Sequence, residues 1–422
     1  MNDRAQTGDR PVAAIVDGYS TGNFLPAAFD RHGADVVHVQ STPEWMTSML
    51  LPDLNQYTGN IVYDDHDKTL RRIRESGAVA VLAGQEPGVP LADLLSKDLG
   101  VASNGTTYSA AKRDKFHMIE AIRDAGLHCA DQLRSGSVDE IVGWARERDE
   151  FPVVVKPLSS ASTDGVTICH DVDEVRDAAE AVLAAEDIFD IRNREVLVQS
   201  YLDGVEYIVD TVSSHGERFV VGVWRYDKNL VNGKNLYDRD VLIPADEEPV
   251  AELIAYTDKV LDALNIRHGP THTEVKMTSS GPALVEIGAR LNGNMNPDFH
   301  NVCLGHNQAD LMALAYLDPQ RFAREYGGRN YQVRRPAIVY NAPSEASGEV
   351  EEVDAAAVKR IEELPSVFLM SVKVKPGGRV KRTVDLLTSP LRIFMTGESM
   401  ADIDRDYHRI QEWKDEVYRL SC

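Results

Sequence analysis

Hydrophobic runs near the start of the chain alternate with a segment of helical spacing, and this pattern predicts a doubly wound α/β unit. The runs that are apolar on both faces, as in buried parallel strands, are 12–19, 35–39 and 79–83. The helical segment, 25–31, lies between the first two runs. No G-x-G-x-x-G follows the first run, so the pattern carries no dinucleotide fingerprint.

The middle of the chain mixes helical and strand patterns. A helix with Ser109 as its N-cap and Gly126 as its C-cap is predicted first. A second helix is predicted at 138–148. Strands are then predicted at 151–157, 166–169, 195–201, 207–212 and 219–226. A loop at 229–240 and a helix at 250–264 follow. The loop is polar, and the last helix is amphipathic.

The end of the chain predicts a small mixed lobe. After a helix over 310–317, strands are expected at 336–340, 368–374 and 391–395. A last helix carries apolar residues at intervals of three and four from Ile403 to Leu420, which indicates a face docked on the rest of the protein.

Between the amphipathic helix and the end lobe, two alternating runs flank Ser-Ser-Gly at 279–281, which suits a three-residue hairpin loop. With that loop, Glu274 lies opposite Glu286 on one face, about 5 Å apart at Cβ. Opposed like charges destabilise a sheet unless they are neutralised, and carboxylates beside phosphate oxygens are typical Mg²⁺ ligands. The alternative is an exposed hairpin with solvated glutamates, partly offset by Lys276. A loop one residue longer or shorter would separate the two carboxylates.

Two segments have the chemistry of phosphate binding. The strand that ends in Lys156 leads into small, hydroxyl-bearing residues up to Gly165, which could close over phosphates or form a plain β-turn. A Walker motif is absent. Lys115 belongs to a cluster of cations near a predicted helix start, where cations are unfavourable unless they point into solvent or meet an anion.

Three further positions suit recognition of other groups, although each also has an ordinary surface role. Residues 199–202 could recognise a flat base by their backbone, and Glu206 could accept hydrogen bonds from hydroxyls. Glu86 follows a predicted strand, at the edge where open α/β sheets bind ligands.

Composition narrows the class of protein. The 422 residues are 43% hydrophobic and 27% charged, as in ordinary globular proteins of two or three domains. Lys plus Arg number 45 against 67 Asp plus Glu, which argues against nucleic acid as the main partner. The four cysteines lack paired spacing, and no signal core or membrane span is apparent. A cytoplasmic protein with reduced thiols, without a membrane partner, is therefore expected.

In their order along the chain, the motifs resemble the ATP-grasp superfamily, and within it the carboxylate–amine ligases close to the L-amino-acid (dipeptide) ligases. The segments that carry the resemblance are KRDKFHM, VVVKP, SSASTDG, VQSYLDGVEY, HTEVK and VEIGARLNGN. The resemblance implies a multidomain α/β and α+β protein with the ATP-grasp fold. A Rossmann-like domain would occupy 1–108, a central subdomain with a phosphate lid 109–200, and a C-terminal subdomain with the metal site and a small β-rich lobe 201–422.

The resemblance also implies roles for individual residues. Those that would bind ATP are Lys115, Lys156, Ser159, Ser160, Ser162, Gln199, Tyr201, Leu202 and Glu206. The substrate contacts would be Glu86, Arg290, Asn292 and Asn294. Glu274 and Glu286 match the carboxylates that bind the metal, two Mg²⁺ ions or Mn²⁺ in their place. Lys156 and Arg290 would act in catalysis.

One position departs from the family pattern. Many members have Glu-x-Asn at the second metal position, whereas this chain has Gly288 in place of the asparagine. Water or Asn292 would then have to complete the metal site.

The resemblance implies ATP-dependent formation of an amide between a small carboxylate and a small amine, through an acyl phosphate, with release of ADP and phosphate. Asp238, Asp240 and His272 remain alternatives for the general base. A homodimer would be a common arrangement for such an enzyme. The alternative functions are another ATP-grasp reaction, of the carboxylase or purine-pathway type, and a non-catalytic ATP-binding module.

Overall fold

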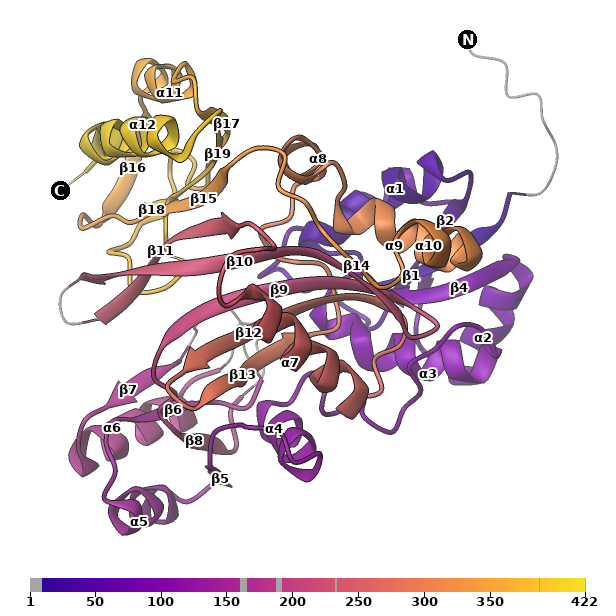
Figure 1. Cartoon of the computed structure of the whole chain (residues 1–422), viewed down its shortest axis with the longest axis horizontal. Coiled ribbons are helices and arrows are strands. Elements are labelled where there is room, and N and C mark those ends of the chain that lie inside the picture. Colours follow the sequence, from indigo (N-terminus) through magenta and orange to yellow (C-terminus); the bar gives the residue numbers. More distant parts are fainter. Residues whose placement is uncertain (1–9, 160–164, 187–191, 232–233, 387, 422) are drawn as a thin grey trace.

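The computed structural model describes residues 10–159, 165–186, 192–231, 234–386 and 388–421, and within these ranges the strands form four sheets (Figure 1). Each of the three larger sheets falls within one of the three segments expected from the sequence. The exact domain boundaries stay a prediction. The third sheet continues into a small lobe formed by the end of the chain.

The first sheet is parallel, in the order β3-β2-β1-β4, and has helices on both faces, as the pattern predicted. Its strands are β1 (Val12–Val16), β2 (Asp35–Gln40), β3 (Asn60–Val62) and β4 (Ala78–Ala83). Its helices are α1 (Leu25–Arg31), α2 (His66–Glu75) and α3 (Val89–Leu99). Side chains of α1 pack on one face together with α9 (Gln308–Leu317), and those of α2 and α3 pack on the other.

The second sheet is antiparallel, in the order β5-β8-β6-β7, and packs against two helices. The strands are β5 (Gln132–Ser135), β6 (Val153–Pro157), β7 (Thr167–Cys169) and β8 (Val196–Ser200). The helices are α5 (Val138–Arg148) and α6 (Val172–Ala184).

The helix predicted to begin after Ser109 begins later, which corrects that prediction. Helix α4 spans Lys115–Asp124, and the side chain of Asp114 caps it by accepting from the N–H of His117. The hydroxyl of Ser109 instead donates to Asp93, which also pairs with the buried Lys112 at 2.9 Å. These bonds fix the preceding residues in turns, so the helix starts with Lys115 at its N-terminus.

The third sheet is the largest and runs from β13 at one edge to β17 at the other, in the order β13-β12-β9-β10-β11-β15-β19-β17, with β14 paired to β10. Its strands are β9 (Val205–Ser214), β10 (Glu217–Val231), β11 (Lys234–Ile243), β12 (Gly269–Thr278), β13 (Gly281–Gly288), β14 (Arg329–Asn330), β15 (Ala337–Ala342), β17 (Val367–Val372) and β19 (Leu391–Thr396). The helices beside it are α7 (Val250–Ala263), α8 (Pro297–Leu304), α9 and α10 (Pro319–Glu325).

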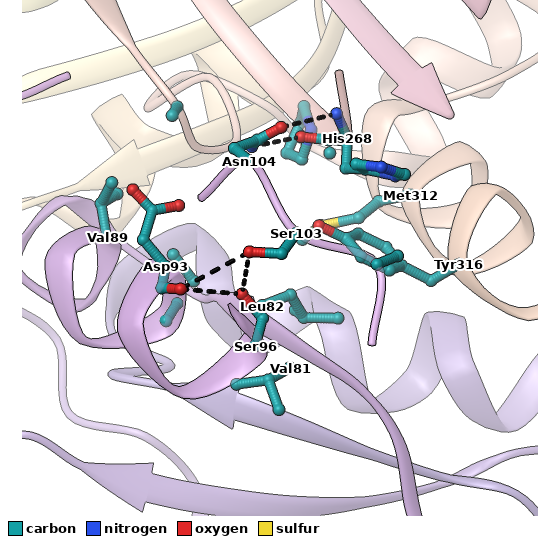
Figure 2. Close-up of a pocket in the computed structure, with 16 residues that line it drawn as sticks. Val81, Leu82, Val89, Asp93, Ser96, Ser103, Asn104, His268, Met312 and Tyr316 are labelled. Carbon is teal, nitrogen blue, oxygen red and sulfur yellow. Dashed lines mark hydrogen bonds between the residues drawn. The ribbon is translucent and has the colours of Figure 1, made fainter. Parts of the chain in front are cut away.

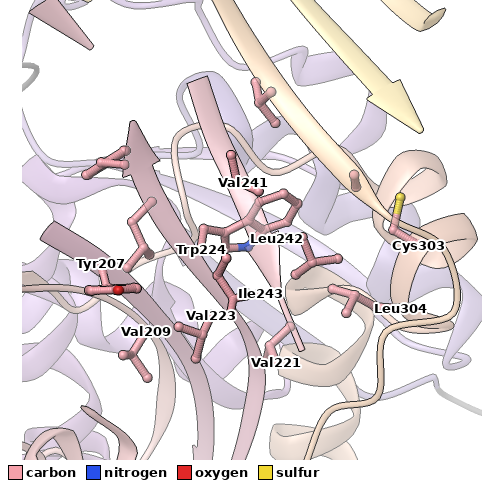
Figure 3. Close-up of a cluster of buried hydrophobic side chains, with 14 of the residues drawn as sticks. Tyr207, Val209, Val221, Val223, Trp224, Val241, Leu242, Ile243, Cys303 and Leu304 are labelled. Carbon is pink, nitrogen blue, oxygen red and sulfur yellow. The ribbon is translucent and has the colours of Figure 1, made fainter. Parts of the chain in front are cut away.

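The prediction of a polar loop over 229–240 was wrong, because β10 and β11 pair there as a long antiparallel hairpin. Backbone pairing does not require apolar side chains, so a polar sequence can continue a ladder. In the parts of β10 and β11 that follow the same ladder, Trp224 and Leu242 belong to the main hydrophobic core together with Leu304 of α8 (Figure 3).

The end lobe holds a three-stranded sheet and two helices. Its elements are β16 (Gly348–Val353), α11 (Ala355–Glu362), β18 (Arg379–Val380), α12 (Met400–Trp413) and β20 (Tyr418–Leu420). The last helix ends at Trp413 rather than near Leu420, since the chain turns and Leu420 pairs with Val350 of β16. The predicted docking of its apolar face is confirmed, because Ile403 and Ile410 are fully buried.

None of the helices in the described part of the chain is long and apolar enough to span a bilayer.

Candidate active site

The hairpin of β12 and β13 brings Glu274 and Glu286 directly opposite each other, as predicted, but by a different route. Thr278 pairs with Gly281, so the turn holds two residues rather than the three expected. A β-bulge at Val285 then shifts the register by one residue and restores the pairing of the two glutamates. The turn was one residue shorter than predicted, and the bulge compensates for it.

Two lysines meet these carboxylates from another part of the chain. The N–H of Lys115 donates to the carbonyl of Leu158 at 3.0 Å, which ties the start of α4 to the end of β6. Lys115 Nζ then lies 2.8 Å from Glu286 Oε1. Lys156 lies at the end of β6 and is only 6% exposed.

The electrostatics of this cluster follow from burial and from close charges. Burial, with repulsion from Lys115, lowers the pKa of Lys156 to about 8 against the pull of the nearby glutamates. Burial alone would raise the pKa of Glu286, but Lys115, Lys156 and Arg290 hold it below its ordinary value. The glutamate is therefore a carboxylate at neutral pH.

The donor set of Glu274 and Glu286 fits Mg²⁺. Two opposed carboxylates supply hard oxygen ligands, and the surrounding lysines suit the phosphates that complete such sites. In the described ranges no group of three acidic, histidine or cysteine side chains forms a ready-made metal cage. That is the usual state of nucleotide Mg²⁺ sites, in which one or two carboxylates act together with substrate phosphates.

Residues predicted to bind the adenine and the ribose of ATP lie beside the same cluster. Lys276 donates to the carbonyl of Leu202 at 2.8 Å, and its ammonium lies 4.6 Å from the ring centroid of Tyr201. Glu206 is 4% exposed and pairs with Lys228 at 2.8 Å. Lys228 is a residue that the sequence reasoning missed, since it lies between the predicted strand 219–226 and the predicted loop 229–240 and belongs to neither.

The remaining predicted ATP residues are placed as follows. The amide of Gln199 donates to the Gln132 side chain at 2.9 Å, which links β8 to β5. Ser159 is half-buried just beyond Lys156. Ser160 and Ser162, with most of the predicted lid, lie outside the described residues.

The N-terminal unit reaches the site through Glu86, whose carboxylate pairs with Arg290 at 2.9 Å. This contact explains the departure at Gly288. A Cβ on Gly288 would lie 3.1 Å from Glu86 Oε2 and 3.3 Å from the Arg290 side chain. A larger residue there would require the two side chains of the ion pair to shift by a few tenths of an ångström.

Asn292 and Asn294 take part in a buried hydrogen-bonded chain. Asn292 donates to Asp210 at 2.7 Å, and its side-chain oxygen accepts from the N–H of Asn294. Asn294 in turn donates to Asp240 at 2.7 Å. Asn292 is thus engaged in this chain, which makes water the better candidate to complete the metal site.

His272 connects the same chain to the metal carboxylates. Its Nδ1 lies 2.9 Å from Asp210 Oδ1, and its Nε2 lies 3.6 Å from Glu274 Oε1. Burial would lower the pKa of His272, but the hydrogen bonds to Asp210 and Glu274 raise it to about 9. Asp210 was not predicted, because only the register of β9 against β12 reveals its place.

Asp238 lies elsewhere. Its carboxylate accepts from Tyr407 on α12 at 2.6 Å, on the side of the end lobe.

A small cavity between the N-terminal unit and the start of β12 is not part of this site. Asp93, Ser103, His268 and Tyr316 line it, and its volume of about 30 Å³ has room for about one water molecule (Figure 2).

The fold and the site define an ATP-grasp protein. The family model described as "ATP-grasp domain" matches residues 149–298, which include Lys156 and both carboxylates of the candidate metal site.

The chain belongs to the ATP-grasp amide ligases. It is 35% identical to Dapdiamide A synthase of Enterobacter agglomerans, over 98% of both chains. It is 25% identical to Alanine–anticapsin ligase of Bacillus subtilis, over 71% of this chain and 65% of that protein. The crystal structure of an L-amino acid ligase from Bacillus licheniformis has the same fold, with a TM-score of 0.75 at 18% identity over 98% of this chain and 99% of the other. The protein is therefore an ATP-dependent carboxylate–amine ligase, as the motifs implied.

Proposed function

We propose that the enzyme joins the carboxylate of an amino acid, or of a similar acid, to the amine of a second amino acid, through an acyl phosphate. The observation that carries this proposal is the gathering of Lys115, Lys156, Glu274 and Glu286 around one point, with Arg290 nearby. The names of the relatives, which include amino-acid ligases, support amino acids as substrates.

The site's own residues divide the work. Lys115 and Lys156 neutralise the phosphates of ATP, and Ser159, which follows Lys156 in the chain, donates to them. Tyr201, Leu202 and Gln199 border the adenine, and Glu206 accepts from the ribose. Two Mg²⁺ ions held by Glu274 and Glu286 would offset the charge that develops as the γ-phosphoryl group moves.

The first step joins a carboxylate oxygen of the acid to the γ-phosphorus, and ADP leaves. In the second step a general base takes a proton from the ammonium group, the amine nitrogen bonds to the acyl carbon, the bond to the phosphate oxygen breaks, and phosphate leaves with the electron pair while the nitrogen gives up its second proton. Arg290 stabilises the negative oxygen of the tetrahedral intermediate. The Glu86 carboxylate fixes the orientation of the Arg290 guanidinium.

The contacts that the three candidates for the general base already make narrow the choice among them, but more than one candidate remains. His272 already serves Asp210 and Glu274, and Asp238 serves Tyr407. Asp240 likewise accepts from Asn294, and among the described residues Asp238 Oδ1 and Asp240 Oδ1 both lack a hydrogen-bond partner, so both aspartates remain candidates. The homodimer and the cytoplasmic location stay predictions.

The test is ADP release by the purified protein with ATP and Mg²⁺, across all pairs of the common amino acids, with mass spectrometry of the products. ADP release with a new mass equal to two substrates minus water is expected. ATP binding without ADP release, for every pair and for small non-amino acids, would favour a non-catalytic module instead.

A further inference from the structure

A second polar set lies beyond the metal carboxylates on the same face of the large sheet. Tyr226 of β10 donates to Glu274 at 3.4 Å and is paired directly with Asp240 of β11. Asp240 is paired with Val339 of β15, and Asn341, two residues further on, is paired with Arg392 of β19. Paired residues, and residues two apart, share a face of a sheet. Asp240, Asn341 and Arg392 therefore face the same side as the metal site.

Two of these residues carry buried polar atoms that have no hydrogen-bond partner among the described residues. Asp240 is 2% exposed, and its Oδ1 has no hydrogen-bond partner among the described residues, while its Oδ2 accepts from Asn294. Asn341 is 1% exposed, and within the same described ranges its Nδ2 has no partner, while its Oδ1 accepts from Arg392. An unmade buried hydrogen bond costs about 1–3 kcal/mol, so such groups call for a role.

Arg392 completes the set with a positive charge. Its guanidinium bonds Asn341 at 3.1 Å and the carbonyl of Gly293 at 3.5 Å. No ion pair of Arg392 within 4.0 Å is found among the described residues, although Asp240 is near enough to raise the pKa of Arg392 against the lowering effect of burial. Asp240 and Arg392 do not form a direct salt bridge with each other, and each can still bind a ligand group of opposite charge.

We propose that Asp240, Asn341 and Arg392 form the pocket for the amine substrate, and that this substrate is an α-amino acid with a free carboxylate. The inference rests on the proposed function. The ammonium group lies at Asp240, and the carboxylate lies at Arg392 and the Asn341 amide. The separation of the two charges is what a zwitterion requires, since it presents an ammonium and a carboxylate on one carbon.

The position of Asp240 suits the reaction. Hydrogen bonds lead from Asp240 through Asn294, Asn292 and Asp210 to His272, which approaches the metal carboxylate Glu274. An amine held at Asp240 is thus fixed by the same rigid network that orients the metal site. Burial raises the pKa of Asp240 to about 7, and a bound ammonium would relieve that cost.

The experiment uses substrates that can act in only one role. An N-acetyl amino acid can serve only as the acid, and an amino-acid amide only as the amine. For a productive pair, the wild type is expected to prefer the free amino acid to its amide as the amine by about 10- to 100-fold in kcat/KM, the worth of a charge-assisted hydrogen bond.

Arg392→Ala is expected to remove that preference by raising the KM of the free amino acid, while the KM values of ATP and of the acid stay within twofold. Arg392→Lys should restore part of the preference. Arg382→Ala, which removes an exposed arginine of the same lobe, is the matched control and should change nothing. If Arg392→Ala does not fold, Arg392→Gln replaces it, with thermal unfolding as the check.

The outcomes separate the two proposals. Normal amide synthesis with an unchanged preference in the Arg392 variants, or a raised KM for the acid instead, would overturn the pocket and leave the ligase intact. Absence of ADP release from every pair would count against the proposed function. Calorimetry of the free amino acids with the Mg²⁺–ADP complex of the wild type and Arg392→Ala would then decide the pocket, and equal binding to both proteins would overturn it.

Discussion

The nucleotide half of the site and the proposed amine half differ in how their charges are balanced. In the nucleotide half, Lys115 pairs with Glu286 and Lys228 pairs with Glu206. In the amine half, Asp240 and Asn341 each have a buried polar atom with no hydrogen-bond partner in the part of the chain that the structure describes. The pairs named in the first half balance each other's charge, although burial and repulsion from Lys115 still lower the pKa of Lys156 there, whereas the second half holds buried polar atoms that are not paired.

The difference has a consequence for mutation. Removing a charge from the nucleotide half leaves its partner unpaired, so both activity and the arrangement of the site suffer. Removing the buried charge of the amine half relieves a cost, so activity should fall while stability rises.

The largest expected effect is in the nucleotide half. Glu286→Gln removes a metal carboxylate and the partner of Lys115, and turnover should fall by at least about 100-fold. The assay is ADP release with a productive pair, and Glu363→Gln, an exposed change on the surface, is the control. Intact amide synthesis by Glu286→Gln would mean that the metal assignment is wrong.

Asp240→Asn tests the amine half through stability. The folded protein holds the Asp240 proton up to a pKa of about 7, whereas the ordinary value is 3.8. Between these values the folded state binds more protons than the unfolded state, so this group makes the protein less stable as pH rises. Asparagine cannot titrate, and it should therefore stabilise the protein by about 1–3 kcal/mol more at pH 7 than at pH 4.

Chemical denaturation at both pH values measures that difference, and the same variant should raise the KM of the amine while the KM of ATP is unchanged. A stability difference that is the same at pH 4 and pH 7 would show that Asp240 is not held in a costly environment.

The smallest expected effect concerns the border between the halves. Gly288→Ala would press a methyl group against Glu86 and Arg290, and kcat should fall by about 10-fold with little change in the KM of ATP. Gly143→Ala is the matched control, because nothing lies within 4 Å of a Cβ built there. Equal kcat values for both variants would mean that the position of Arg290 does not matter to the reaction.

The sequence predicted those parts of the site that depend on local pattern. The opposed glutamates, the lysine at the end of β6 and the motif order required only short segments, and the fold class and the ligase activity followed from the resemblance. Two predictions from local sequence patterns were wrong, because another local feature took precedence. Asp114 was a better cap than Ser109, and a polar ladder looked like a loop.

The rest depends on contacts between distant segments. Gly288 lies against the ion pair between Arg290 and Glu86, and Glu86 comes from the N-terminal unit. Asn341 and Arg392 carry no motif, and only the pairing of β11, β15 and β19 brings them near Asp240. Local sequence patterns could not have predicted that those residues lie close together.

The most direct test of the central claim follows an oxygen atom. The acid of a productive pair, labelled with ¹⁸O in its carboxylate, is ligated in the presence of ATP and Mg²⁺, and the released phosphate is analysed by mass spectrometry. An acyl phosphate transfers one carboxylate oxygen to phosphate, so the account predicts one ¹⁸O atom in each phosphate formed. Unlabelled phosphate beside a labelled amide product would contradict it.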